Sequence, residues 1–65
     1  MRYNRGDVVR IQTYCNVIDV TILEQMNCNG EAIKIYKAWD MNLDEELFIT
    51  DTQILKLLHF GYCFD

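Results

Sequence analysis

Apolar and polar residues alternate along much of the first half of the chain. In residues 7–13, and again in residues 17–25, apolar side chains recur at alternating positions with polar ones between them. Ile18, Val20 and Ile22 share one face of the second segment, and their β-branched side chains favour a pleated strand. A period of two rather than 3.6 predicts that both segments are strands with one buried face.

A turn follows the second of these strands. The segment Met26-Asn27-Cys28-Asn29-Gly30 ends in an Asn-Gly pair, which readily adopts the positive φ angles that tight hairpins require. We therefore expect a hairpin between the second strand and the third.

The third strand is expected over residues 32–39. Ile33 and Ile35 alternate there with polar residues, so we expect them to face the core while Tyr36 faces solvent. Lys37 falls on the same face as the isoleucines, which predicts a bulge or a sharp bend at that position. An acidic loop over residues 40–46 and a short fourth strand over residues 47–50 follow.

The pattern after residue 50 has two interpretations. Thr50-Asp51-Thr52-Gln53 has the spacing of a helix capping box, and the apolar residues that follow suit a helical stripe that Gly61 would close. This predicts a helix of about ten residues. The other interpretation is a 3₁₀ turn over residues 51–54 that leads into a fifth strand over residues 55–58.

The order of these parts resembles that of small SH3-like barrels, including KOW-like modules and short bacterial or phage-encoded barrels. Three stretches carry the resemblance: Tyr3-Asn4-Arg5-Gly6-Asp7-Val8-Val9-Arg10-Ile11, Asp19-Val20-Thr21-Ile22-Leu23-Glu24, and Glu46-Leu47-Phe48-Ile49-Thr50-Asp51-Thr52-Gln53-Ile54-Leu55-Lys56-Leu57. The resemblance implies an all-β fold, a small five-stranded SH3-like barrel with a 3₁₀ turn before the last strand. A fifth strand would also help to close the edges that four strands leave open. The alternative fold is a four-stranded sheet plus one C-terminal helix.

Charge is distributed unevenly along the chain. Six Lys and Arg residues stand against ten Asp and Glu residues, for a net charge of -4, and residues 40–51 carry acidic residues with no cation. Binding nucleic acid by neutralising its backbone needs a basic face, which this balance disfavours. No stretch approaches the roughly 20 apolar residues of a membrane span, and the N-terminal residues lack an apolar signal core. We therefore expect one soluble, cytoplasmic domain over residues 1–65.

Residues that carry chemistry are few and scattered. Cys15, Cys28 and Cys63 are far apart and form no Cys-x-x-Cys pair, which argues against a disulfide framework and a metal site. His59 is the single histidine, and the three isolated glycines exclude a Gly-rich phosphate loop. We therefore expect no catalytic residue, no metal and no cofactor, in a protein that is not an enzyme.

Eight aromatic residues are more than so small a barrel can bury. We expect exposed rings to recognise another protein beside an acidic rim, which implies a partner with a basic surface. The candidate partner-binding residues are Tyr14, Tyr36, Asp44, Glu45, Glu46, Phe60 and Tyr62. Trp39 is expected to lie towards the core, and association through residues 60–64 would give a homodimer.

A non-enzymatic protein-interaction module is therefore the function that we favour from the sequence. The alternative is a nucleic-acid-binding barrel that uses Arg2, Arg5, Arg10, Lys34 and Lys37, with Tyr14 and Tyr36 as stacking groups. Residues with A/T-rich codons (Asn, Ile, Tyr, Lys and Phe) total 22, whereas Pro, Gly, Ala and Arg total eight. This bias suits a phage accessory protein, and such a protein would bind a host factor.

Overall fold

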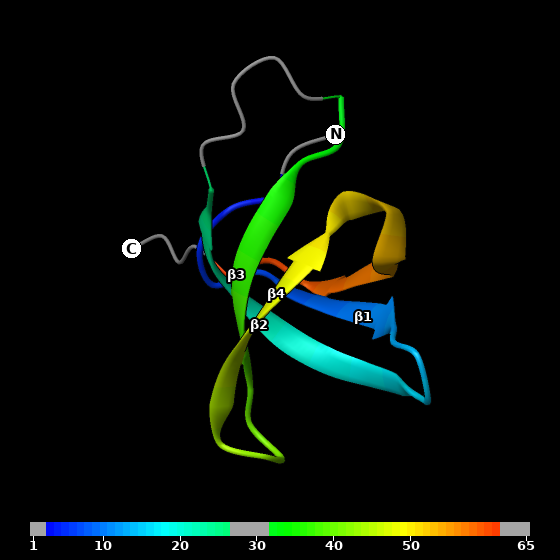
Figure 1. Cartoon of the computed structure of the whole chain (residues 1–65). Helices are drawn as coiled ribbons and strands as arrows, with labels where there is room; N and C mark the ends of the chain where they lie inside the picture. Colours follow the sequence, from blue (N-terminus) through cyan, green and yellow to red (C-terminus); the bar gives the residue numbers. More distant parts are fainter. Residues whose placement is uncertain (1–2, 27–31, 62–65) are drawn as a thin grey trace.

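A computed structural model describes residues 3–26 and 32–61, which form five strands and one 3₁₀ turn. The elements are β1 (Val8–Gln12), β2 (Val17–Gln25), β3 (Ile35–Asp40), β4 (Glu45–Thr50), the 3₁₀ turn η1 (Asp51–Gln53) and β5 (Ile54–His59). All strand pairs are antiparallel, in the order β4-β3-β2-β1-β5 (Figure 1). The all-β prediction is confirmed. Because β4 and β5 do not pair with each other, hydrogen bonding leaves the sheet open at both of these strands.

The segment after residue 50 is a 3₁₀ turn and a strand, so the alternative fold with a C-terminal helix is wrong. The capping signal is real, since the Thr50 backbone N–H donates to Gln53 Oε1 at 3.0 Å. However, Ile54 is already extended, with φ -78° and ψ 120°. The Gln53 side-chain amide donates to the Gln12 carbonyl at 3.0 Å, which ties the turn to the end of β1. β5 then pairs with β1, and its partly buried Ile54 and Leu57 pack against the core.

The core lies on the inner face of the curved sheet. The alternation predicted for the first two strands is confirmed, because Val9 and Ile11 of β1 and Val20 and Ile22 of β2 are buried. The remaining buried apolar side chains are Tyr36 and Ala38 of β3 and Ile49 of β4. No α-helix or second layer of the described residues covers this face, so the sheet has to curl over its own side chains to keep water out.

The third strand begins later than the pattern predicts, and its two faces are exchanged. Tyr36, expected to face solvent and bind a partner, is fully buried, whereas Ile33 lies before β3 and is 47% exposed. Burial of the tyrosine is tolerated because its hydroxyl accepts a hydrogen bond from the Tyr3 backbone N–H at 3.2 Å. The two rings also pack edge to face, with centroids 5.9 Å apart. Tyr36 is therefore a core residue, and its assignment to a partner-binding or base-stacking surface is wrong.

The irregularity predicted at Lys37 lies on the neighbouring strand. The register between β3 and β4 is unbroken, whereas that between β2 and β3 shifts between Ile22 and Glu24. Leu23 therefore has no partner on β3, which is the signature of a bulge in β2. The predicted Asn29-Gly30 turn lies outside the described residues. Next to it, the Met26 N–H donates to the Ile35 carbonyl at 2.8 Å, which starts the pairing of β2 with β3.

Asp7 joins the beginning of the described chain to its end. This side chain is 3% exposed, and its two carboxylate oxygens accept hydrogen bonds from the backbone N–H groups of Asn4 and Gly61, both at 2.9 Å. Gly6 has φ +90°, and a Cβ at Gly61 would lie 1.7 Å from the Gly6 carbonyl carbon. The two glycines therefore allow the backbones to approach closely enough for Asp7 to bridge them.

We expect Tyr36→Ala to reduce the free energy of unfolding by about 3–5 kcal/mol, because it opens a cavity in the core and removes the acceptor for the Tyr3 N–H. Tyr14→Ala is the matched control, since Tyr14 is fully exposed, and we expect it to leave stability nearly unchanged. Urea unfolding followed by circular dichroism compares the two. Equal stability of the two variants would contradict the core placement of Tyr36.

We expect Asp7→Asn to cost about 1–3 kcal/mol of stability, because an amide has only one oxygen for the two backbone donors that Asp7 now satisfies. Asp19→Asn, which changes a carboxylate in an exposed ion pair, is the control and should cost much less. Thermal unfolding of both variants tests this. A smaller loss for the Asp7 variant than for its control would show that the bridge does not hold the chain ends.

Candidate functional site

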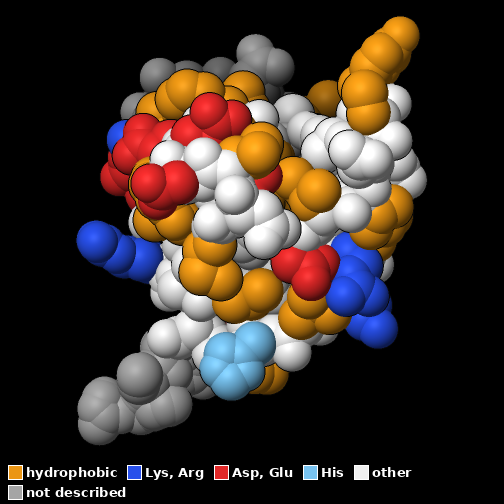
Figure 2. Space-filling model, turned by 90° about the horizontal axis from the view of Figure 1, so that it is seen from below, with side chains coloured by type: hydrophobic (Ala, Val, Ile, Leu, Met, Phe, Trp, Pro, Cys, Tyr) orange, Lys and Arg blue, Asp and Glu red, His pale blue; other side chains and the backbone are white. Residues whose placement is uncertain are grey.

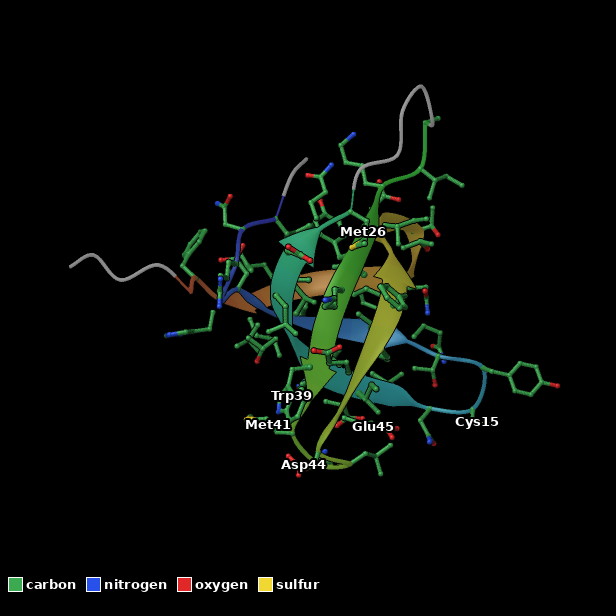
Figure 3. All side chains as sticks on the ribbon, turned by 60° about the vertical axis from the view of Figure 1, so that its left-hand side comes forward. Cys15, Met26, Trp39, Met41, Asp44 and Glu45 are labelled. Atoms are coloured by element: carbon green, nitrogen blue, oxygen red, sulfur yellow. The ribbon has the colours of Figure 1, made fainter. Side chains whose placement is uncertain are left out.

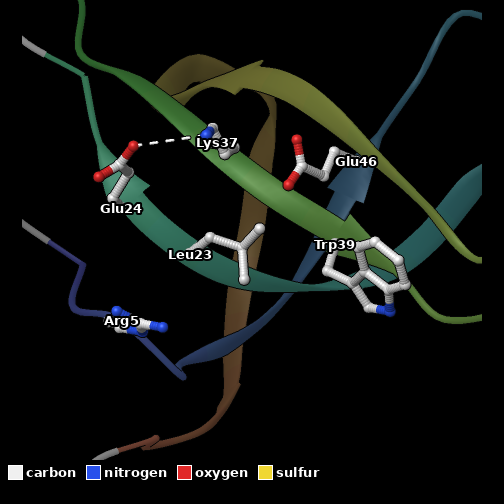
Figure 4. Close-up of a pocket in the computed structure, with 6 residues that line it drawn as sticks. All are labelled: Arg5, Leu23, Glu24, Lys37, Trp39 and Glu46. Atoms are coloured by element: carbon white, nitrogen blue, oxygen red, sulfur yellow. Dashed lines mark ion pairs between the residues drawn. The ribbon is translucent and has the colours of Figure 1, made fainter.

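An open groove of about 410 Å³ crosses the outer face of β2, β3 and β4 (Figure 4). Its walls combine an indole ring and an aliphatic side chain with charged groups of both signs. The lining residues are Arg5, Leu23, Glu24, Lys37, Trp39 and Glu46.

The strand register explains why these side chains meet. Trp39 on β3 lies directly opposite Glu46 on β4, so their side chains share the outer face. The bulge in β2 brings Leu23 to the same groove, and Lys37 forms an ion pair with Glu24 at 3.6 Å. Trp39 was expected to lie towards the core, but it is only half-buried and lines this groove.

The turn between β3 and β4 is shaped by a buried carboxylate. Asp40 is 3% exposed, and its Oδ1 accepts hydrogen bonds from the backbone N–H groups of Asn42 at 2.9 Å and Leu43 at 3.3 Å. An aspartate that binds the backbone two and three residues ahead fixes a tight turn. The side chains of Met41 and Leu43 consequently project outward, with exposures of 71% and 66%.

Three acidic residues follow these two apolar ones along the chain. Asp44, Glu45 and Glu46 are all exposed, and within the described residues none of the three forms an ion pair. We call the group formed by Met41, Leu43, Asp44, Glu45 and Glu46 the acidic turn surface. Figure 2 shows acidic and hydrophobic side chains gathered over this end of the molecule, and Figure 3 shows Trp39, Met41, Asp44 and Glu45 at the end of the hairpin formed by β3 and β4.

The other aromatic candidates lie elsewhere. Tyr14 is completely exposed in the turn between β1 and β2, where the Thr13 hydroxyl oxygen accepts hydrogen bonds from the N–H groups of Cys15 and Asn16. Phe60 is 62% exposed and follows β5, and Tyr62 lies outside the described residues. Of the predicted partner-binding residues, Tyr36 is therefore buried, and Tyr14, Phe60 and the acidic residues belong to three different segments.

Two of the cations proposed for nucleic-acid binding are engaged by carboxylates. Arg10 Nε and Nη2 donate to the two carboxylate oxygens of Asp19 at 2.9 and 3.3 Å, and Lys37 is paired with Glu24. The hydrogen bond from Arg10 holds the pKa of the Asp19 carboxyl below its usual range, and the same contact raises the pKa of Arg10. Arg5 lines the groove, Lys34 precedes β3, and Arg2 lies outside the described residues. The named cations therefore belong to separate elements, and two of them are already neutralised.

The described residues contain no group of three or more metal-ligating side chains, and none of their helices is long and apolar enough to cross a membrane. Cys15 is an exposed free thiol in the turn between β1 and β2. No known family model, curated relative or solved structure matches the chain.

Sequence reasoning missed the groove and the apolar half of the acidic turn surface. The contact between Trp39 and Glu46 depends on the register of two strands, which periodicity does not determine. A local signal for the turn was present, because an aspartate at the end of a strand typically accepts a hydrogen bond from the backbone N–H two residues further on. Such a turn places Met41 and Leu43 outside the sheet.

We expect Arg10→Gln to return the pKa of Asp19 towards its ordinary value of 3.8, since the guanidinium hydrogen bond is the main cause of the shift. A lowered folded pKa means that the pair stabilises the fold above the unfolded pKa, and this contribution is lost as the pH falls through the folded value. Carboxyl ¹³C titration by NMR below about pH 5 measures the pKa of Asp19 in the wild type and in the Arg10→Gln variant. An unchanged Asp19 titration would show that Arg10 does not stabilise the carboxylate in solution.

Proposed function

We propose that this chain is a small SH3-like barrel that acts as a non-enzymatic protein-interaction module. The support for the barrel is the strand order, with a 3₁₀ turn between β4 and β5, which is the arrangement implied by the family resemblance. Since β4 and β5 do not pair, closure in this proposal comes from side chains of both strands. Ile49 of β4 and Ile54 and Leu57 of β5 belong to or pack against one core cluster.

The acidic turn surface is the observation that carries the interaction proposal. Met41 and Leu43 expose apolar side chains on a turn whose backbone is held by Asp40. Because the turn is already ordered, binding costs little backbone conformational entropy. The adjacent carboxylates give this apolar surface a negative rim. Apolar contact surrounded by charge is the usual composition of a protein-binding surface, where the charge selects the partner.

The partner is expected to present Lys or Arg next to apolar side chains. Glu46 is exposed beside Trp39, so a guanidinium or ammonium group that enters the groove meets a carboxylate and an aromatic ring together. The net charge of -4 adds long-range attraction towards a basic protein.

We expect the wild-type chain, immobilised and challenged with lysate or candidate proteins, to retain a basic partner that Met41→Ser/Leu43→Ser and Glu45→Gln/Glu46→Gln variants release. The first double variant removes the apolar contact and the second removes the negative rim. Each should weaken binding at least about tenfold. Binding should also fall with added salt, and nuclease treatment should not affect it.

Asp51→Asn is the control, since it removes a carboxylate in η1, at the opposite end of β4 from the acidic turn surface, and should retain the partner. Circular dichroism confirms that each variant is folded. Equal retention by all variants would refute the proposed surface, and release by nuclease would favour the nucleic-acid alternative instead.

A further inference from the structure

The two outer strands of the sheet differ in how well they can accept another strand. β5 pairs with β1 with two register shifts, between Val8 and Val9 and between Arg10 and Ile11, and it carries Lys56 among its exposed residues. Irregular pairing and an outward lysine are features that protect an edge strand from further pairing. β4 pairs with β3 through six consecutive residues without any shift, and it exposes Phe48 to 62%. β4 is therefore the regular and less protected edge.

Three hydrogen bonds donated by backbone N–H groups determine which groups of β4 face outward from the sheet. The Asp51 N–H donates to the Lys34 carbonyl at 2.9 Å, one step beyond the pair of Ile35 and Thr50. The Ile35 carbonyl points towards β2, where it accepts a hydrogen bond from the Met26 N–H. The Thr50 N–H points away from β3 and donates to Gln53 Oε1. All three bonds agree with one alternating antiparallel pattern.

In that pattern the residues of β4 that exchange hydrogen bonds with β3 are Glu45, Leu47 and Ile49. The N–H and C=O groups of Glu46 and Phe48 are directed to the open side. Their side chains point to the outer face, because Glu46 lies opposite Trp39 and Phe48 opposite Lys37. The open backbone groups thus belong to Glu46, which lines the groove and is part of the acidic turn surface, and to Phe48, which lies opposite the groove residue Lys37.

We propose that β4 binds an extended, basic segment of the partner protein as an added antiparallel strand, hydrogen-bonded to Glu46 and Phe48. This inference rests on the proposed function and specifies how the partner is held. Backbone hydrogen bonds then provide affinity, and alternate side chains provide selectivity.

The register defines the sequence that fits. The partner residue opposite Phe48 has its side chain on the outer face and is apolar, because it covers an exposed aromatic ring. Two residues further along the partner, the side chain opposite Glu46 is Arg or Lys, which pairs with the carboxylate and reaches towards Trp39. The segment thus reads apolar, any residue, basic. A second copy of this chain fits less well, since each copy has a net charge of -4.

The probe is the blocked peptide Thr-Thr-Val-Thr-Arg-Thr-Lys-Thr, titrated into the ¹⁵N-labelled full chain and followed by NMR. We expect the largest shift changes at the Glu46 and Phe48 amides. N-methylation of the Val or the Arg amide of the peptide should weaken binding at least about tenfold, because these amides point towards β4. N-methylation of the Thr between them is the matched control and should leave the affinity within about twofold, since its N–H points away.

Variants of the protein provide the reciprocal test. Phe48→Pro removes the outward N–H without removing a bond to β3, and a proline is tolerated at such an edge position. Phe48→Val loses the ring but keeps the N–H, so we expect the proline variant to bind the peptide at least about fivefold more weakly than the valine variant. The peptide scan decides the question even where the proline variant is unfolded.

Equal effects of N-methylation at all three positions would overturn the added strand and leave side-chain recognition by the acidic turn surface intact. Equal binding of a peptide with Glu in place of Arg and Lys, or no binding of the basic peptide, would overturn the inference. Loss of charge dependence would also contradict the proposed function. A doubled mass in light scattering that Phe48→Pro abolishes would assign the edge to a second copy of the chain.

Discussion

One sheet has to bury its own inner face, and the rest of the molecule follows from that constraint. The described residues supply no helix or second layer to cover the apolar side chains of β1 to β4. The strands therefore curve around these side chains to exclude water, and Asp7 ties Asn4 near the beginning of the described residues to Gly61 at their end. The groove lined by Trp39 and Glu46 lies on the outside of the sheet, on the face opposite this core.

The same constraint explains which parts of the fold could be predicted. In β1 and β2 the buried residues Val9, Ile11, Val20 and Ile22 alternate with outward residues such as Arg10 and Asp19, so periodicity identifies both the strands and their buried faces. In β3 periodicity identifies a strand but assigns its faces wrongly. The inward positions hold Tyr36, Ala38 and Asp40, of which two are polar, and they are buried because backbone groups satisfy their oxygen atoms. The hydrogen bond to Tyr36 depends on tertiary structure and those to Asp40 depend on the turn, so the hydrophobic pattern of the sequence does not predict either.

The C-terminal ambiguity has a similar cause. A capping box and an apolar run after it are compatible with a helix, and the capping contact between Thr50 and Gln53 does form. The strand forms instead of a helix because β1 has an unpaired side with which β5 can pair. The side-chain amide of Gln53 also donates a hydrogen bond to the Gln12 carbonyl, 41 residues away in sequence. For the candidate site, exposure of Asp44, Glu45 and Glu46 follows from their local charge. The position of Glu46 beside Trp39 depends on strand register and was therefore not predictable.

Asp40 connects the stability of the fold to the chemistry of its surface. The buried Asp40 carboxylate at the end of β3 is tolerated because two backbone N–H groups of the turn donate hydrogen bonds to one of its oxygens. The turn formed in this way exposes the apolar side chains of Met41 and Leu43. Exposed apolar groups on a regular edge strand invite aggregation unless something selects the partner. Glu45 and Glu46 begin that edge strand, so their charge discourages pairing with acidic copies of the chain. In the proposed interaction the same two carboxylates also attract the basic segment, so that protection of the edge and selection of the partner have one cause.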